Sequence, residues 1–216
     1  MTTIVLVRHS SVDAIGNWLA GRRLGLPLND HGLNEATTLV DRMACFPITA
    51  IYSSPMQRAV ETASPLAQRL NLEIRVRDEF NELDFGEWTG KTFDELDSLN
   101  AWRRFNQFRA TASIPGGESM LAVAARMVTG IESLRELHHD HHDHCVAIFS
   151  HADPIRAAIA HYVGMHLDFL PRIDIDLASI SVLKFDPSGA KLLKLNDTGQ
   201  SSSHDTAQSA FAAARD

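Results

Sequence analysis

Two arginines and two histidines stand where short apolar runs of this sequence come to an end. Arg8 and His9 directly follow "IVLV", Arg58 lies shortly after "AIYSS", and His151 closes "CVAIFSH". Cationic side chains beside buried segments are costly to hide unpaired, so a negative group is expected opposite them. Guanidinium groups bind phosphate oxygens in a bidentate manner, and a neutral imidazole can attack phosphorus directly. The four residues therefore indicate phosphoryl transfer through a phosphohistidine.

The segments that carry these residues alternate between strand-like and helical patterns. Strand-like runs cover residues 3–8, 50–54, 73–77, 145–151 and 179–185, and a turn with a last strand follows in "DPSGAKLLKLN". Helical patterns cover residues 31–45, 55–70, 92–108, 118–137 and 152–164. This alternation predicts an α/β fold: a three-layer α/β/α sandwich whose mostly parallel sheet is covered on both faces. Ligands of such sheets bind outside the carboxyl ends of the strands, where the arginines and histidines stand.

Length and charge narrow the possible partners. The 216 residues fit a single domain, expected over 1–196, and the segment 197–216, rich in Ser and Ala, is predicted to be a mobile tail. A net charge of -7 argues against nucleic acid or an anionic membrane as the main partner.

Without a signal-peptide pattern or a membrane-spanning run, the chain is expected to be cytoplasmic. Cys45 and Cys145 lack disulfide or zinc spacing and are predicted to be buried free thiols.

Four motifs of the sequence, in this order, resemble those of the histidine phosphatase superfamily, also called phosphoglycerate mutase-like. They are the Arg-His pair at 8–9, "SPMQRAVETA", "ELDFGEWTG" and "SHADPIRAA". The stretch that follows the last motif resembles a bacterial phosphatase branch. The resemblance implies a phosphoglycerate mutase-like fold and a histidine acid phosphatase-type enzyme, without metal or cofactor, that hydrolyses a small phosphomonoester.

The resemblance also implies a role for each site residue. His9 is the implied nucleophile, and the implied general acid is Glu82. The phosphoryl group is bound by Arg8, Arg58 and His151.

The proton donor is the one role for which the residues themselves leave a choice. The chemistry needs a carboxyl group that stays protonated beside the leaving oxygen, which requires partial burial or a nearby like charge. The resemblance favours Glu82, and Glu79 is the next candidate. Asp84 and Glu87 are expected to cap or solvate the turn around Gly86.

Several positions bear on the substrate rather than on the chemistry. Ser10 stands where the family usually has glycine, which puts the substrate in question but not the nucleophile. Arg22 and Arg23 either lean over the site or form a solvated pair. Trp18, Trp88 and Trp102 either line a pocket or, as is the default for large aromatic side chains, belong to the core.

The segment "HHDHHDH" (138–144) has the composition of a metal site, but as a loop between a helix and a strand it is expected to be solvated. Three other functions stay open. A phosphoglycerate-type mutase would use the same chemistry, an inactive relative would bind a phosphorylated ligand as a sensor, and a metal-binding protein would use the histidine run. The oligomeric state is not readable from the sequence.

Overall fold

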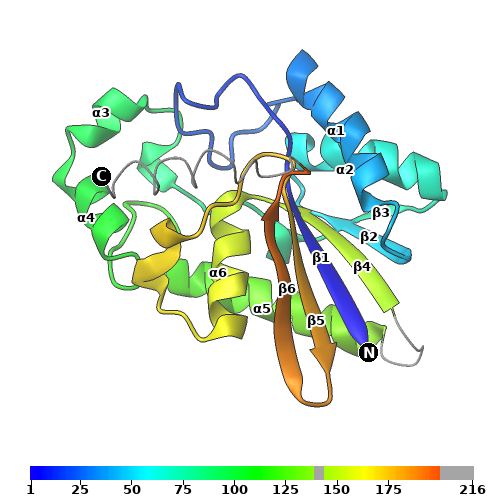
Figure 1. Ribbon diagram of the computed structural model, residues 1–216. Helices are drawn as coiled ribbons and strands as arrows, with labels where there is room; N and C mark the ends of the chain where they lie inside the picture. The colour runs from blue at the N-terminus through cyan, green and yellow to red at the C-terminus, as the bar shows by residue number, and fades with distance from the viewer. Residues whose placement is uncertain (139–143, 200–216) are drawn as a thin grey trace, which may run out of the picture.

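The computed structural model describes residues 1–138 and 144–199, in which a six-stranded sheet lies between two layers of helices (Figure 1). The strands are β1 (Thr2–Arg8), β2 (Ile48–Ser53), β3 (Ile74–Val76), β4 (His144–Ser150), β5 (Ile180–Asp186) and β6 (Gly189–Asp197). The α-helices are α1 (Asp30–Met43), α2 (Gln57–Leu70), α3 (Phe93–Asp97), α4 (Asn100–Gln107), α5 (Met120–Leu137) and α6 (Ala152–Val163). Three short 3-10 helices are η1 (Asp78–Phe80), η2 (Gly86–Trp88) and η3 (Leu167–Arg172). The predicted three-layer α/β fold is confirmed.

The strands follow the order β3-β2-β4-β1-β5-β6 across the sheet. The first four of these strands are parallel neighbours, whereas β5 pairs antiparallel with β1, and β6 pairs antiparallel with β5. The sheet is therefore mostly parallel, as predicted, with an antiparallel hairpin at one edge. The hairpin turns at "DPSG", where the carboxylate of Asp186 accepts the backbone N–H of Ser188.

Alternate residues of β1 point into two separate apolar clusters. Ile4 and Leu6 pack in the cluster that contains residues of α5 and α6, whereas Val5 and Val7 pack in the one that contains residues of α1 and α2. All four side chains are fully buried. Burial on both faces explains why this strand is an unbroken apolar run rather than an alternating one.

The parallel strands β1, β2 and β4 end side by side. Arg8 is the register partner of Ser150, and the backbone N–H of His9 donates to the carbonyl of Ser150 at 2.9 Å. The backbone N–H of Ser54, just after β2, donates to the carbonyl of Phe149 at 2.9 Å. Hydrogen bonds that continue the sheet thus hold the first residues beyond the three strands next to one another.

The helix predicted over 92–108 is two helices, α3 and α4, that are separated at Ser98 and Leu99. In one straight helix, Leu96 and Phe105 would lie on opposite sides, since nine residues turn the chain by about 180° beyond full turns. Both side chains are fully buried in the same cluster. The break lets both of them reach it.

Other expectations about the chain meet different outcomes. Cys145 is a buried free thiol, but Cys45 is exposed, because it lies in the turn after α1 rather than on the helix face that packs on the sheet. β6 runs to Asp197, one residue past the predicted end of the domain. Residues 200–216 of the predicted tail lie outside the described residues. Among the described helices, none has the length and apolar character that crossing a bilayer requires.

Candidate active site

His9 follows the carboxyl end of β1 with its ring held in one tautomer. The residue is 4% exposed, and Nδ1 lies 2.7 Å from the carbonyl oxygen of Ser10. Because a carbonyl only accepts, Nδ1 carries the hydrogen and Nε2 keeps its lone pair. Burial lowers the pKa of His9 well below its usual value, and the positive charges of Arg58 and Arg8 lower it further. At neutral pH the ring is therefore an uncharged imidazole with a free Nε2, the form in which a histidine is a nucleophile.

Arg58 and Arg8 bring two guanidinium groups to the same end of the sheet. Arg58 lies in the first turn of α2, is 1% exposed, and donates from Nη2 to the carbonyl of Gly21 at 2.8 Å. Arg8 donates from Nη1 to the carbonyl of Ile175 at 2.6 Å. The Nε atom of each arginine is buried and has no hydrogen-bond partner among the described residues. Buried guanidinium N–H groups with unused donor capacity favour an anion at this place.

His151 follows β4 and is the residue directly before α6. Its ring is fully buried, and its centroid lies 5.1 Å from that of His9. Nε2 lies 2.8 Å from Oγ of Ser54, which already accepts the backbone N–H of Met56 at 3.2 Å. The hydroxyl hydrogen of Ser54 is thus available to Nε2, an arrangement that leaves the ring hydrogen on Nδ1. Burial lowers the pKa of His151 well below its usual value, so this ring too is neutral.

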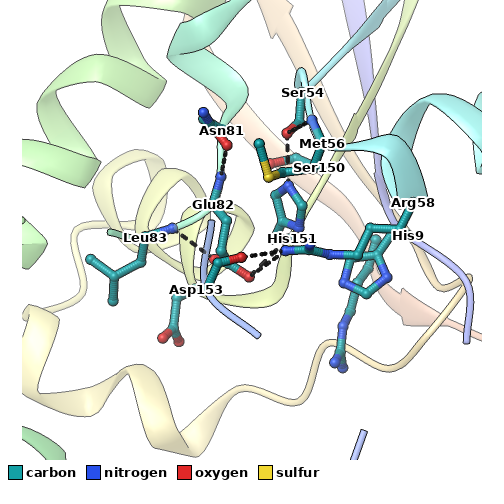
Figure 2. A network of polar contacts seen from close by, with 12 residues as sticks. His9, Ser54, Met56, Arg58, Asn81, Glu82, Leu83, Ser150, His151 and Asp153 are labelled. Atoms are coloured by element: carbon teal, nitrogen blue, oxygen red, sulfur yellow. Dashed lines mark hydrogen bonds and ion pairs between the residues drawn. The ribbon is translucent and has the colours of Figure 1, made fainter. Parts of the chain in front are cut away.

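Glu82 brings a carboxyl group next to His151 and Arg58, as Figure 2 shows. Its Oε2 lies 3.6 Å from Nδ1 of His151 and 3.8 Å from Nη2 of Arg58, while Oε1 accepts the N–H of Leu83 at 2.8 Å. Burial raises the pKa of Glu82 to about 7; Arg58 opposes this rise, and the negative charge of Asp153 adds to it. Near neutral pH the group therefore exists in both protonation states, as a proton donor must.

Arg126 of α5 holds the backbone that carries Glu82, a role that the sequence analysis missed. Its Nη1 donates to the carbonyls of Glu79 and Asn81 at 2.7 Å each, and its Nη2 donates to the carbonyl of Glu82 at 3.1 Å. These bonds fix the chain on both sides of the carboxyl-bearing residue. Arg126 is therefore a positioning residue for Glu82.

Arg22 and Glu118 complete this support. Arg22 donates from Nε to the carbonyl of Glu82 at 2.8 Å, so it neither leans over the site nor forms a solvated pair. Glu118 pairs with Arg22 at 3.0 Å and with Arg126 at 2.8 Å. One carboxylate thus orients the two guanidinium groups that hold the Glu82 backbone.

A cavity of about 360 Å³ is lined by Arg8, His9, Arg58 and Glu82. Much of its remaining lining is apolar: Val12, Ala14, Ile15, Trp18, Leu19, Phe85, Phe93 and Trp102. The expected core placement is right for Trp88, which is 2% exposed. Trp102 is buried and also lines the cavity, whereas Trp18 is only half-buried and lines the cavity. The volume and the apolar lining are typical of a site for a small organic molecule.

The competing acidic residues lie elsewhere. Glu79 is absent from the cavity lining and has an oxygen 3.5 Å from Nη1 of Arg77. Asp84 accepts the backbone N–H of Gly86 at 2.9 Å, as expected for the turn, and Glu87 is exposed. Of the four candidates, Glu82 is the one that lies beside the two histidines.

Two further positions from the sequence can be placed. The backbone N–H of Ser10 donates to Oγ1 of Thr62 at 2.9 Å, while Oγ of Ser10 is buried and has no hydrogen-bond partner in the described part of the chain. The centre of the histidine run, residues 139–143, lies outside the described residues. Within the described ranges, no group of three or more His, Cys, Asp or Glu side chains is arranged to hold a metal ion.

The solved structures of known phosphatases share this architecture. A mycobacterial glucosyl-3-phosphoglycerate phosphatase is 26% identical in sequence and superposes with a TM-score of 0.81 over 90% of this chain and 98% of its own. A phosphoserine phosphatase from Entamoeba histolytica, solved with phosphoserine bound, is 21% identical with a TM-score of 0.82 and covers 92% of this chain and 98% of its own. At that identity the second likeness shows the fold alone.

The sequence comparisons are more specific. Phosphoserine phosphatase 1 of Hydrogenobacter thermophilus is 30% identical over 204 residues, which cover 92% of this chain and 93% of the relative. The family model of the histidine phosphatase superfamily (branch 1) matches residues 4–198, nearly the whole described part of the chain. With Arg8, His9, Arg58 and Glu82 in the lining of one cavity, and His151 3.6 Å from the Glu82 carboxyl, the chain belongs to the histidine phosphatase superfamily.

Proposed function

We propose that the chain is a metal-independent phosphomonoesterase of the histidine acid phosphatase type that hydrolyses a small phosphorylated metabolite through a phosphohistidine on His9. The observation that carries this proposal is the geometry at His9: Nδ1 lies 2.7 Å from the carbonyl oxygen of Ser10, which leaves Nε2 unprotonated next to two buried guanidinium groups, and burial lowers the pKa of the ring. The phosphatase names of the relatives support the same reaction class. Cytoplasmic location stays a prediction from the sequence.

In the first step, Nε2 of His9 attacks phosphorus, and the bond between phosphorus and the substrate's ester oxygen breaks. Arg8 and Arg58 neutralise the charge on the phosphoryl oxygens, and Nδ1–H of His151 donates to one of them. The leaving oxygen takes the proton of Glu82, which becomes a carboxylate. The neutral state of His9 is essential here, since a cationic His9 would have no lone pair to attack with.

In the second step, a water molecule attacks the phosphohistidine. The Glu82 carboxylate takes a proton from the water, a bond forms between phosphorus and the water oxygen, and the bond to Nε2 breaks. Inorganic phosphate leaves, while His9 and Glu82 return to their starting protonation states. A pKa of about 7 suits this double use, because the group gives and takes its proton at similar cost.

The test has two readouts. One is release of inorganic phosphate from a panel of phosphomonoesters in the presence of EDTA, and the other is the label that a phosphomonoester with a radioactive phosphoryl group leaves on the enzyme, trapped by alkaline quench. His9→Ala is expected to lose both turnover and the label. His31→Ala is the matched control, because the His31 side chain is 74% exposed and lies outside the cavity lining. It is expected to keep both.

Turnover that survives His9→Ala, or that disappears from wild type in EDTA, would contradict the proposal. A wild-type label that passes to a second glycerate rather than to water would identify a mutase. Binding of phosphorylated ligands with neither label nor turnover would identify a sensor.

A further inference from the structure

Three charged side chains form a second polar group in the lining of the cavity, apart from the residues given a role above. They are Arg109, which follows α4, and Asp153 and Arg156, which lie in the first turns of α6. Oδ1 of Asp153 lies 2.8 Å from Nη1 of Arg109 and 3.2 Å from Nη1 of Arg156. One carboxylate oxygen therefore serves two guanidinium groups.

The two arginines keep donor capacity that this carboxylate does not use. The Arg109 side chain is only 10% exposed, and its Nε has no hydrogen-bond partner among the described residues. Arg156 donates from Nε to the carbonyl of Ile173 at 2.7 Å, so its guanidinium is fixed in the cavity wall rather than swinging in solvent. Buried, oriented donors of this kind are suited to a planar anion such as a carboxylate.

The charge of the whole lining points the same way. The lining carries four positive side chains and the negative Asp153, which leave a net charge of +3 when Glu82 is protonated. The positive side chains are those of Arg8, Arg58, Arg109 and Arg156. A phosphoryl dianion at Arg8 and Arg58 neutralises two of these charges. One positive charge remains, at the Arg109 and Arg156 end of the lining, and a substrate with one further negative charge would neutralise it.

The rest of the lining limits what joins the two anionic groups. Trp18, Phe85, Phe93 and Trp102 present apolar surface to the cavity. A sugar ring with several hydroxyl groups would lose hydrogen bonds to water there without replacing them. A short carbon chain or an aromatic ring would not.

We propose that Arg109 and Arg156 form a carboxylate subsite, so that the preferred substrate is a phosphomonoester whose compact, weakly polar organic part carries a carboxylate. This inference rests on the proposed function and adds the substrate class. The two arginines are specificity residues: they bind the end of the substrate that does not react. Asp153 holds them in place.

The test uses two pairs of esters that differ in the carboxylate. 3-Phosphoglycerate is compared with glycerol 3-phosphate, and 4-carboxyphenyl phosphate with phenyl phosphate, as kcat/KM in wild type and in Arg156→Gln. Loss of one charged hydrogen-bonded contact is expected to lower kcat/KM about 10- to 100-fold for the carboxylated member of each pair and less than about threefold for the other. Arg156→Lys, which keeps the charge, is expected to restore part of the preference.

Arg109→Gln provides a second variant with the same expected pattern, in case Arg156→Gln does not fold. Arg172→Gln is the matched control, because Arg172 stacks on Phe169 outside the cavity lining. The subsite is rejected if wild type hydrolyses both members of each pair alike, or if the variants slow both members equally. Hydrolysis of all four esters without preference leaves the proposed function intact, whereas no hydrolysis of any ester overturns the proposed function itself.

Discussion

Replacing Glu82 by glutamine removes the acidic proton that the proposed mechanism needs and keeps the shape of the side chain. The amide oxygen can still accept the N–H of Leu83, which Oε1 accepts at 2.8 Å. What is lost is the ability to protonate the leaving oxygen, and general acid catalysis contributes about 10²- to 10⁴-fold to such steps. We therefore expect a loss of that size for alkyl phosphates.

The leaving group determines how much of this loss appears. An alkoxide needs a proton to leave, whereas 4-nitrophenolate needs little help. Glu82→Gln is therefore expected to slow hydrolysis of glycerol 3-phosphate far more than hydrolysis of 4-nitrophenyl phosphate. The comparison separates an acid role from a general disturbance of the site, which would slow both esters.

The pKa of Glu82 determines how strongly the effect of Glu82→Gln should change with pH. With a pKa of about 7, Glu82 is protonated in about 90% of molecules at pH 6 and about 10% at pH 8. Activity that needs the protonated form is lost as the pH rises through 7, so the ratio of wild-type to Glu82→Gln kcat/KM should fall about tenfold between these pH values. Taking the ratio at each pH cancels the ionisation of the substrate.

The assay is steady-state phosphate release from the two esters between pH 5.5 and 8.5. Glu79→Gln is the matched control, since Glu79 lies outside the cavity lining beside Arg77, and it should retain the wild-type profile. Equal slowing of the two esters, or a ratio that does not change with pH, would refute the acid role of Glu82. If Glu79→Gln instead abolishes the decrease of activity as the pH rises through 7, Glu79 rather than Glu82 is the proton donor.

Three further outcomes follow from the same geometry. Arg126→Met should lower the free energy of unfolding in urea by about 3 kcal/mol or more, because three backbone carbonyls lose their donor, and should slow alkyl phosphates more than 4-nitrophenyl phosphate. Because the pKa of Glu82 rises from 4.5 in the unfolded chain to about 7 in the fold, the protonated group stabilises the fold at low pH, and this stabilisation is lost as the pH rises through 7; the stability of Glu82→Gln relative to wild type should therefore grow by about 2 to 3 kcal/mol from pH 5 to pH 8; a constant difference would contradict the pKa. Ser10→Gly should keep turnover and change stability by less than about 1 kcal/mol, since the lost hydroxyl is buried and has no hydrogen-bond partner among residues 1–138 and 144–199; loss of folding and turnover together would show that the hydroxyl has a role.

The sequence could predict the elements of the fold and where Arg8, His9, Arg58 and His151 gather, because these features are local. Each of the four ends a strand, directly follows one or lies in the first turn of a helix, and parallel strands that share a sheet end at the same edge. The helix break between α3 and α4 was not predicted, since a helical pattern over 92–108 does not show which cluster Leu96 and Phe105 must share.

The support of Glu82 could not be predicted for a different reason. Arg126 binds backbone carbonyls more than 40 residues away, and carbonyls are the same in every residue. The one signal in the sequence is a charged residue beside buried Val123 and Met127 on a largely apolar helix. The carboxylate subsite was likewise invisible, because Arg109 and Asp153 meet only after α4 and α6 are placed.

The register between β1 and β4 separates what can vary in this protein from what cannot. His9 donates its backbone N–H to Ser150, the residue before His151, so the spacing of the two imidazoles is a property of neighbouring strands. Most of the cavity wall, in contrast, comes from residues 12–21, the segment around Phe85 and Phe93, and the end of α4, with the start of α6 completing it. Loops tolerate substitution and insertion far better than central strands do. Evolution can therefore refit the wall to a new phosphomonoester while the reacting geometry is inherited unchanged, and a shared reaction among relatives does not require a shared substrate.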